Sequence, residues 1–153
     1  MSADTAYVDT SALAKWYLPE PGSEAFVEFI VRHDGAVISR LTSVELLCLL
    51  ARRRRAGDIT AEHERNAWLT FEDDIRAGHL RVEALADGHA LRARALLERV
   101  RDLPLRTLDA LHLAIAQSIE AGVLATADLG MARAARALGF TVVAFGRGSL
   151  STR

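Results

Sequence analysis

The sequence predicts an α/β protein: a three-layer α/β/α sandwich whose central sheet is mostly parallel. One observation and one general rule carry this prediction. Short apolar runs, typical of buried strands, alternate with longer segments of helical periodicity from one end of the chain to the other. Strands that alternate with helices are joined by right-handed crossovers, which make the strands parallel and place helices on both faces of the sheet.

Five runs are predicted as strands because they are short, apolar and bounded by turn residues or charges. They lie at residues 5–9, 35–39, 79–85, 123–126 and 140–145. The first of them, TAYVD, ends on a carboxylate, Asp9. Aspartate is almost never buried without a partner, so its place at the end of a buried strand needs an explanation.

Seven segments are predicted as helices, and residues that stop helices mark several of their ends. They lie at residues 11–18, 23–32, 41–56, 60–77, 87–101, 107–121 and 129–138. Pro19 and Pro104 follow two of these helices. Gly57, Gly122 and Gly139 follow three others, as glycine commonly does at a helix C-terminus.

Composition limits the class of protein. A chain of 153 residues that is 50% hydrophobic and 25% charged predicts one soluble domain over residues 1–146, followed by a flexible tail, residues 147–153. The net charge of -1 argues against a generally basic nucleic-acid binder. No apolar run approaches the roughly 18 residues that span a bilayer, and the single Cys48 fits a reducing compartment. We therefore expect a cytoplasmic protein with no membrane partner.

Four acidic residues stand near the junctions of strands and helices. Asp9 and Asp128 come at or just after the ends of predicted strands. Glu45 lies early in a helix that follows a strand, and Asp109 opens the helix before the fourth strand. Open α/β sheets bind ligands at the carboxyl edge of their parallel strands, so we expect these four side chains to lie together there.

Each acid also has a purely structural explanation. Asp9 and Asp128 suit the N-cap position, where a side-chain oxygen accepts from free backbone N–H groups. Glu45 stands three residues after Thr42, which is the spacing of a capping box. Asp109 in the first turn of its helix favours the helix dipole. Taken singly, no acid requires a ligand.

Taken together, the acids predict a cation site. No comparable set of basic residues stands at these junctions, although Lys15 is near Asp9 in the sequence. Four carboxylates at one edge would repel one another by on the order of several kcal/mol at a low effective dielectric. Either some of them are protonated or a cation binds between them. Hard divalent cations prefer oxygen ligands, and magnesium binds a few carboxylates together with water and substrate phosphates.

Four blocks of the sequence resemble the signature blocks of the PIN-domain ribonucleases, in that family's order: YVDTSALAKWYLPEPGS, LTSVELLCLLARRRRAG, TLDALHLAIAQ and LATADLGMARAARALGF. The resemblance spans residues 7–145 and is greatest to the VapC-type toxins of toxin–antitoxin modules. It implies that the family's metal-binding acidic quartet falls on Asp9, Glu45, Asp109 and Asp128. Members of the family differ in whether the last acid touches the metal or only its water shell.

The resemblance also implies supporting roles for Thr10 or Ser11, after the first acid, and for Thr126, before the last one. It implies an endoribonuclease that depends on Mg2+ or Mn2+ and hydrolyses single-stranded or looped RNA with a metal-activated water. The expected products carry a 5′-phosphate and a 3′-hydroxyl. The resemblance further implies a homodimer and a cognate VapB-type antitoxin that covers the active-site groove.

One alternative from another class stays open, in which the same fold binds RNA or a protein partner without cleavage. Two other magnesium-dependent α/β classes are disfavoured by the sequence. A receiver domain needs an acidic pair after the first strand, and a haloacid-dehalogenase-like phosphatase needs aspartate at the position of Ser11. His112, one turn after Asp109, is expected to pack in the protein interior and to take no part in the site.

Overall fold

The computed structural model describes residues 5–33 and 36–146, so the predicted flexible tail, residues 147–153, lies outside the described residues. Its strands are β1 (Ala6–Val8), β2 (Ala36–Ser39), β3 (Leu80–Glu83), β4 (Val123–Thr126) and β5 (Val142–Ala144). Its helices are α1 (Thr10–Tyr17), α2 (Ser23–Arg32), α3 (Arg40–Ala56), α4 (Ala61–Arg76), α5 (Asp87–Arg99), α6 (Thr107–Ser118) and α7 (Leu129–Ala137). Each corresponds to a predicted element, but β3, α5 and α6 end earlier than predicted because turns and extended chain follow them.

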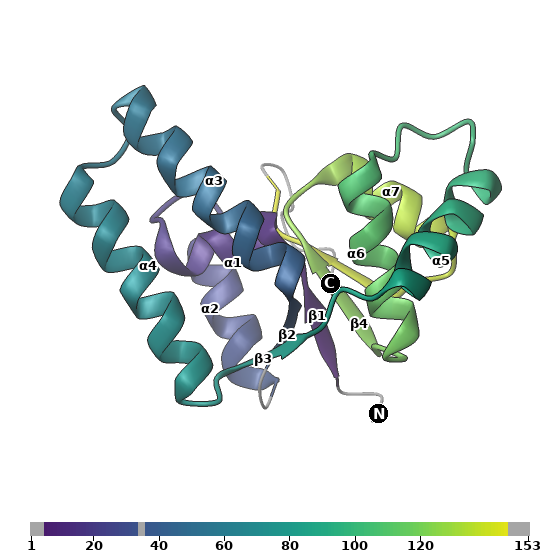
Figure 1. Cartoon of the computed structure of the whole chain (residues 1–153), viewed down its shortest axis with the longest axis horizontal. Helices are drawn as coiled ribbons and strands as arrows, with labels where there is room; N and C mark the ends of the chain where they lie inside the picture. The colour runs from purple at the N-terminus through teal and green to yellow at the C-terminus, as the bar shows by residue number, and fades with distance from the viewer. Residues whose placement is uncertain (1–4, 34–35, 147–153) are drawn as a thin grey trace.

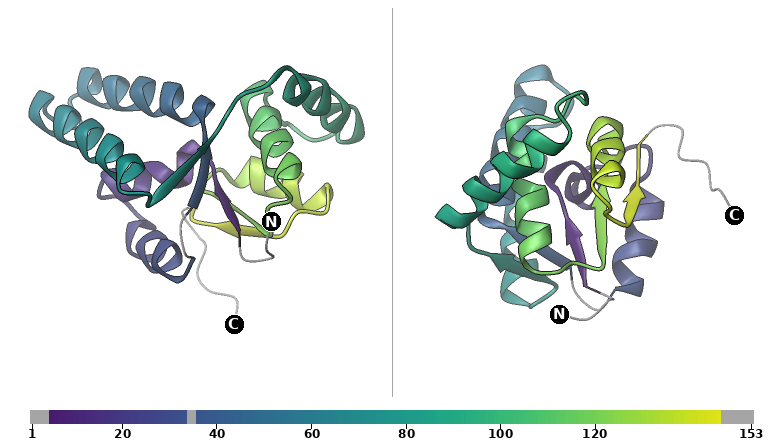
Figure 2. Two further views of the ribbon diagram at one scale, coloured as in Figure 1. Left: turned by 60° about the horizontal axis from the view of Figure 1, so that its bottom comes forward. Right: turned by 90° about the vertical axis from the view of Figure 1, so that its right-hand side faces the viewer.

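The strands form one sheet in the order β3-β2-β1-β4-β5, and every neighbouring pair is parallel. Helices α1 to α4 cover one face and α5 to α7 the other (Figures 1 and 2). The predicted three-layer sandwich is therefore confirmed. Within the ranges that the structure describes, no helix combines the length and the apolar character needed to cross a membrane.

The central strand β1 shows why the sequence specifies two cores. Ala6 and Val8 pack with α1 to α4, whereas Tyr7 faces the opposite cluster, built from α5 to α7. All three side chains are fully buried. A strand covered on both faces has no solvent-exposed side, so an uninterrupted apolar run is what it requires.

The connections of the sheet create a topological switch point beside β1. The chain travels from β1 to β2 over the face covered by α1 and α2, and it reaches β4 after α5 and α6 on the other face. The carboxyl ends of the adjacent strands β1 and β4 therefore lie where the connections diverge. This is the switch point at which open α/β sheets bind ligands.

Gly22 is the N-cap of α2, and its left-handed backbone conformation is one that residues with a Cβ atom rarely adopt. Its φ is +93°, and a Cβ atom there would lie 2.6 Å from the carbonyl oxygen of Phe145. We expect Gly22→Ala to lower the free energy of unfolding by about 2–3 kcal/mol, because left-handed strain adds to a backbone clash. Gly57→Ala, at φ +82° with no atom within 4 Å of its Cβ, is the matched control and should lose only about 1 kcal/mol. Equal losses in urea denaturation would show that the clash contributes nothing.

Candidate active site

Asp9 is held rigidly at the carboxyl end of β1. Its side chain is 3% exposed, and Oδ1 accepts from the backbone N of Ala12 at 2.9 Å and from Ser11 Oγ at 2.8 Å. Oδ2 accepts from Thr126 Oγ1 at 2.5 Å, across the sheet at the end of β4. Asp9 is therefore the N-cap of α1, and the same hydrogen bonds orient its carboxylate within the candidate site.

The environment of Asp9 disfavours its charge. Burial raises the pKa of this carboxyl above its ordinary value of 3.8, although His112 and the hydrogen bonds from Thr126, Ala12 and Ser11 act in the opposite direction. A desolvated carboxylate is stabilised when an opposite charge approaches it. A cation beside Asp9 would therefore favour its ionised form.

The hydroxyl groups that follow β1 serve two different acids. Ser11 Oγ bonds Asp9 and accepts from the backbone N of Ala127 at 2.9 Å, and it lies 3.3 Å from Thr126 Oγ1. Thr10 points elsewhere, because its Oγ1 donates to Glu45 Oε1 at 2.9 Å. The resemblance left a choice between Thr10 and Ser11. In the structure both hydroxyls donate to an acid of the quartet.

Glu45 reaches from α3 toward α6, and its capping-box explanation is wrong. Helix α3 begins directly after its N-cap, Ser39, whose backbone N donates to Thr42 Oγ1 at 3.3 Å. Thr42 is therefore inside the first turn, and Glu45 stands beyond it. The Glu45 carboxylate is instead bonded to His112 Nε2 at 2.5 Å and to Thr10.

The expectation that His112 only packs is also wrong. Its ring is 2% exposed, but Nδ1 lies 2.7 Å from the hydroxyl of Tyr7 while Nε2 contacts Glu45. Burial raises the pKa of Tyr7, so the phenol stays protonated while its hydroxyl is hydrogen-bonded to Nδ1. The Glu45 carboxylate can only accept, so His112 Nε2 carries the proton of the bond between them. Burial alone would raise the pKa of Glu45, but the bonds from His112 and Thr10 and the charge of Arg106 lower it.

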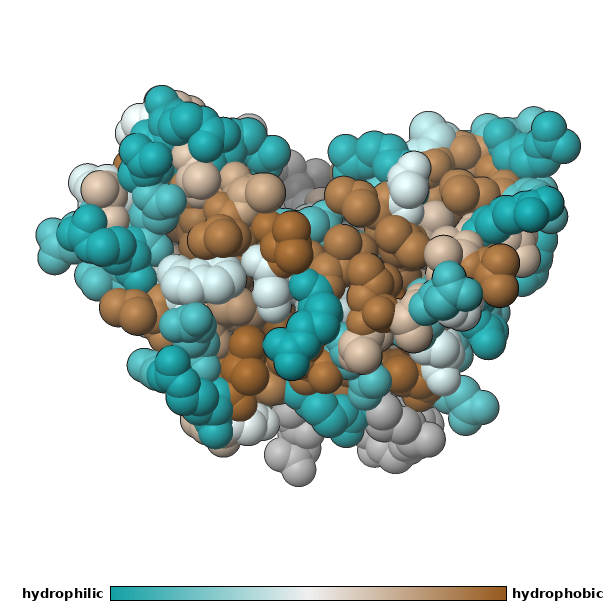
Figure 3. Space-filling view, viewed as in Figure 1, coloured by the Kyte–Doolittle hydropathy of each residue, from teal (hydrophilic) through white to brown (hydrophobic). Residues whose placement is uncertain are grey.

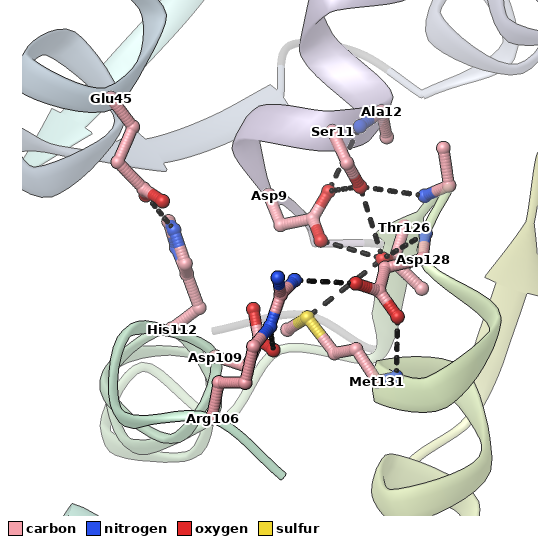
Figure 4. Close-up of polar contacts among 11 residues, drawn as sticks. Asp9, Ser11, Ala12, Glu45, Arg106, Asp109, His112, Thr126, Asp128 and Met131 are labelled. Carbon is pink, nitrogen blue, oxygen red and sulfur yellow. Dashed lines mark hydrogen bonds and ion pairs between the residues drawn. The ribbon is translucent and has the colours of Figure 1, made fainter. Parts of the chain in front are cut away.

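Asp109 and Asp128 share a guanidinium. Asp109 lies in the first turn of α6, and Asp128 caps α7 by accepting from the backbone N of Met131 at 2.9 Å. Arg106 Nε donates to Asp109 Oδ2 at 3.1 Å, and Arg106 Nη2 donates to Asp128 Oδ2 at 2.7 Å (Figure 4). The sequence showed no set of basic residues comparable to the four acids, but one arginine does pair two of them. Lys15 is instead bonded to the loop before α2.

Electrostatic interactions connect the four acids through two residues. The charge of Arg106 acts on Glu45, Asp109 and Asp128, and His112 acts on Asp9, Glu45 and Asp109. Burial raises the pKa of Asp109; Arg106 opposes this shift, and the neighbouring Asp128 reinforces it. Asp109 and Asp128, which come from separate segments, thus lie close enough for one carboxylate to influence the ionisation of the other.

These donors suit a hard divalent cation in kind, because all four acids present carboxylate oxygens. As the side chains stand, however, no group of three or more His, Cys, Asp or Glu within residues 5–33 and 36–146 is arranged to hold a metal ion. Figure 4 shows two reasons: Arg106 is bonded to Asp109 and Asp128, and Glu45 is turned toward His112. The ligand roles of the four acids stay predictions.

Comparison with known proteins identifies the family. The sequence model of the PIN domain matches residues 6–137. Ribonuclease VapC46 of Mycobacterium tuberculosis is 34% identical over 140 residues, which cover 90% of this chain and 95% of that protein. The crystal structure of Mycobacterium tuberculosis VapC20, a sarcin-ricin loop cleaving toxin, superposes with a TM-score of 0.66 at 20% identity, covering 85% of this chain and 95% of VapC20.

A DNA-bound VapBC structure from Salmonella typhimurium has the same fold. Its TM-score is 0.60 at 22% identity, and the match covers 92% of this chain and 98% of the Salmonella chain. At that identity, the likeness shows the fold alone. The family-model match and the 34% identity to VapC46 show the family over most of the sequence. The chain belongs to the PIN-domain family, among the relatives of VapC-type proteins.

Proposed function

We propose that the protein is an endoribonuclease that depends on Mg2+ or Mn2+ and acts as the toxin of a toxin–antitoxin module. The observation that carries this proposal is the gathering of Asp9, Glu45, Asp109 and Asp128 at one edge of the sheet around Arg106 and His112. These four acids face a single permanently charged partner, Arg106. The ribonuclease name of VapC46 supports the choice of RNA as substrate.

The residues have distinct parts in the proposed reaction. Asp9 accepts hydrogen bonds from three donors and so offers the most rigid carboxylate. Asp109 lies in the first turn of α6, and Asp128 is the N-cap of α7. Glu45 receives both of its bonds on Oε1, which leaves Oε2 unengaged by them. A divalent cation bound by these acids would make water a stronger nucleophile and stabilise negative charge on the phosphate.

We further propose a protein partner, a VapB-type antitoxin, and a homodimer. Exposed apolar residues adjoin the acids in the sequence: Val44 and Leu47 flank Glu45 and are 64% and 49% exposed, and Leu108, next to Asp109, is 44% exposed. Figure 3 shows apolar surface over α3 and over the helices on the other side of the sheet. Such surface suits a protein contact, and a partner bound there would cover the acids.

A cleavage assay tests the proposed function. We expect the purified chain, freed of any antitoxin, to cut labelled RNA with Mn2+ or Mg2+, to lose the activity in EDTA and to regain it when metal is restored. Sequencing of the ends should find 5′-phosphates. If several RNAs show no metal-dependent cut, the alternative is favoured, namely a PIN-fold module that binds RNA or protein without cleavage.

A further inference from the structure

Arg106 stands at the N-terminus of α6 and bridges two acids from separate segments. It precedes Asp109 by one helical turn and lies 22 residues from Asp128, so the ion pairs join the start of α6 to the start of α7. In Figure 4 its guanidinium lies between the two carboxylates. The positive charge thus occupies the place where the proposed function requires a cation.

The three side chains of this cluster differ in their exposure to solvent. Asp109 and Asp128 are 14% and 29% exposed, whereas Arg106 is 74% exposed. The guanidinium therefore approaches the acids from the solvent side. Exposed ion pairs contribute little net stability, so Arg106 can leave without disturbing the core. When it leaves, the two acids face each other without compensation.

We infer that Arg106 exchanges partners: it neutralises Asp109 and Asp128 in the metal-free chain, leaves them when a divalent cation is bound, and then binds a phosphate group of the RNA. Arginine suits the second task because its planar fork bonds phosphate oxygens in pairs. A phosphate that engages Arg106 also removes the competitor of the cation. RNA and metal therefore favour each other's binding, and this coupling is reciprocal. The inference rests on the proposed metal-dependent function.

Calorimetric titration of the full chain with Mn2+, in the absence of RNA, tests the exchange without cleavage. Arg106→Gln is expected to bind Mn2+ roughly fivefold to tenfold more tightly than the wild type, because the competing charge is gone. Arg94→Gln is the control, because it removes the same charge at a distant place on the surface. Arg94 lies on α5, is 78% exposed and is paired with Glu98. Unchanged or weaker Mn2+ binding in Arg106→Gln would overturn the inference.

The kinetics of RNA cleavage at saturating Mn2+ test the phosphate contact. Arg106→Gln is expected to raise KM roughly tenfold and to change kcat much less, and Arg106→Lys should restore part of the loss. An unchanged KM overturns the phosphate contact. If the wild type itself binds no Mn2+, the proposed metal-dependent function fails, and the exchange fails with it. If the wild type binds Mn2+ and Arg106→Gln does not differ, only the exchange fails.

Discussion

Asp9→Asn is expected to reduce RNA cleavage by roughly 100-fold or more while leaving the fold intact. Asparagine has the same shape, caps a helix as well as aspartate does, and keeps an oxygen to accept from Ala12. It loses the negative charge and one of the two oxygens that would bind a cation in the proposed site. Growth arrest in cells that express the chain without an antitoxin should disappear together with cleavage.

Asp73→Asn is the matched control for this prediction. Asp73 lies on α4, is 69% exposed and pairs with Arg76, so the same change of charge occurs on a surface helix, outside the acid cluster. It should retain full activity. Substantial cleavage by a well-folded Asp9→Asn variant would remove Asp9 from the proposed cation site.

The same substitution carries a prediction about pH. Burial holds the pKa of Asp9 in the folded, metal-free chain above its unfolded value of 3.8, so the folded state binds more protons in the interval between the two values. Stability therefore falls as the pH rises through that interval. Asp9→Asn removes this penalty and should be at least as stable as the wild type at about pH 7, with a smaller difference at about pH 4.5. Urea denaturation in EDTA measures the difference in free energy of unfolding between the variant and the wild type. A difference that does not change with pH would contradict the prediction.

His112→Ala is expected to lower the free energy of unfolding by about 3 kcal/mol, because it opens a cavity and removes the hydrogen bond between α6 and the buried hydroxyl of Tyr7. Cleavage should also fall by roughly 10-fold or more, since Glu45 loses the donor that orients it. Chemical denaturation and the cleavage assay measure the two effects separately.

Tyr7→Phe supplies the second arm of this experiment. It removes only the hydroxyl and should lose about 1–2 kcal/mol. The double variant with His112→Ala should lose less stability than the sum of the two single losses, because both changes break the same bond. Strict additivity would show that the residues are not coupled. His89→Ala, at a half-buried histidine bonded to Ser118 and to the backbone N of Ala86, should lose only about 1 kcal/mol.

Local patterns were sufficient for the architecture. The apolar run of β1 predicted a strand buried on both faces, and Ala6, Tyr7 and Val8 are fully buried. The beginning of α3 was harder to predict, because Ser39 and Thr42 are both acceptable capping residues. The structure selects Ser39, since β2 extends to that residue and pairs with β3 there. A propensity cannot decide between adjacent candidates when strand pairing sets the boundary.

The partners of the acids were beyond the reach of local patterns. Arg106 stands three residues before Asp109, a spacing that predicts at most a surface ion pair on α6, and its contact with Asp128 depends on the packing of α6 beside α7. His112 meets Glu45 across 67 residues. Only the hydrogen-bonding capacity of a histidine beside an acidic position hinted at this contact.

The sequence by itself determined the alternation of strands and helices and the presence of an acid near each critical junction, because periodicity and capping preferences are properties of neighbouring residues. Only the tertiary structure decided which partners those acids meet: Asp109 and Asp128 pair with an exposed arginine, and Glu45 is bonded to a buried histidine. The physical reason is that charge pairing acts over a few ångströms in space. The separation of two residues along the chain does not report that distance.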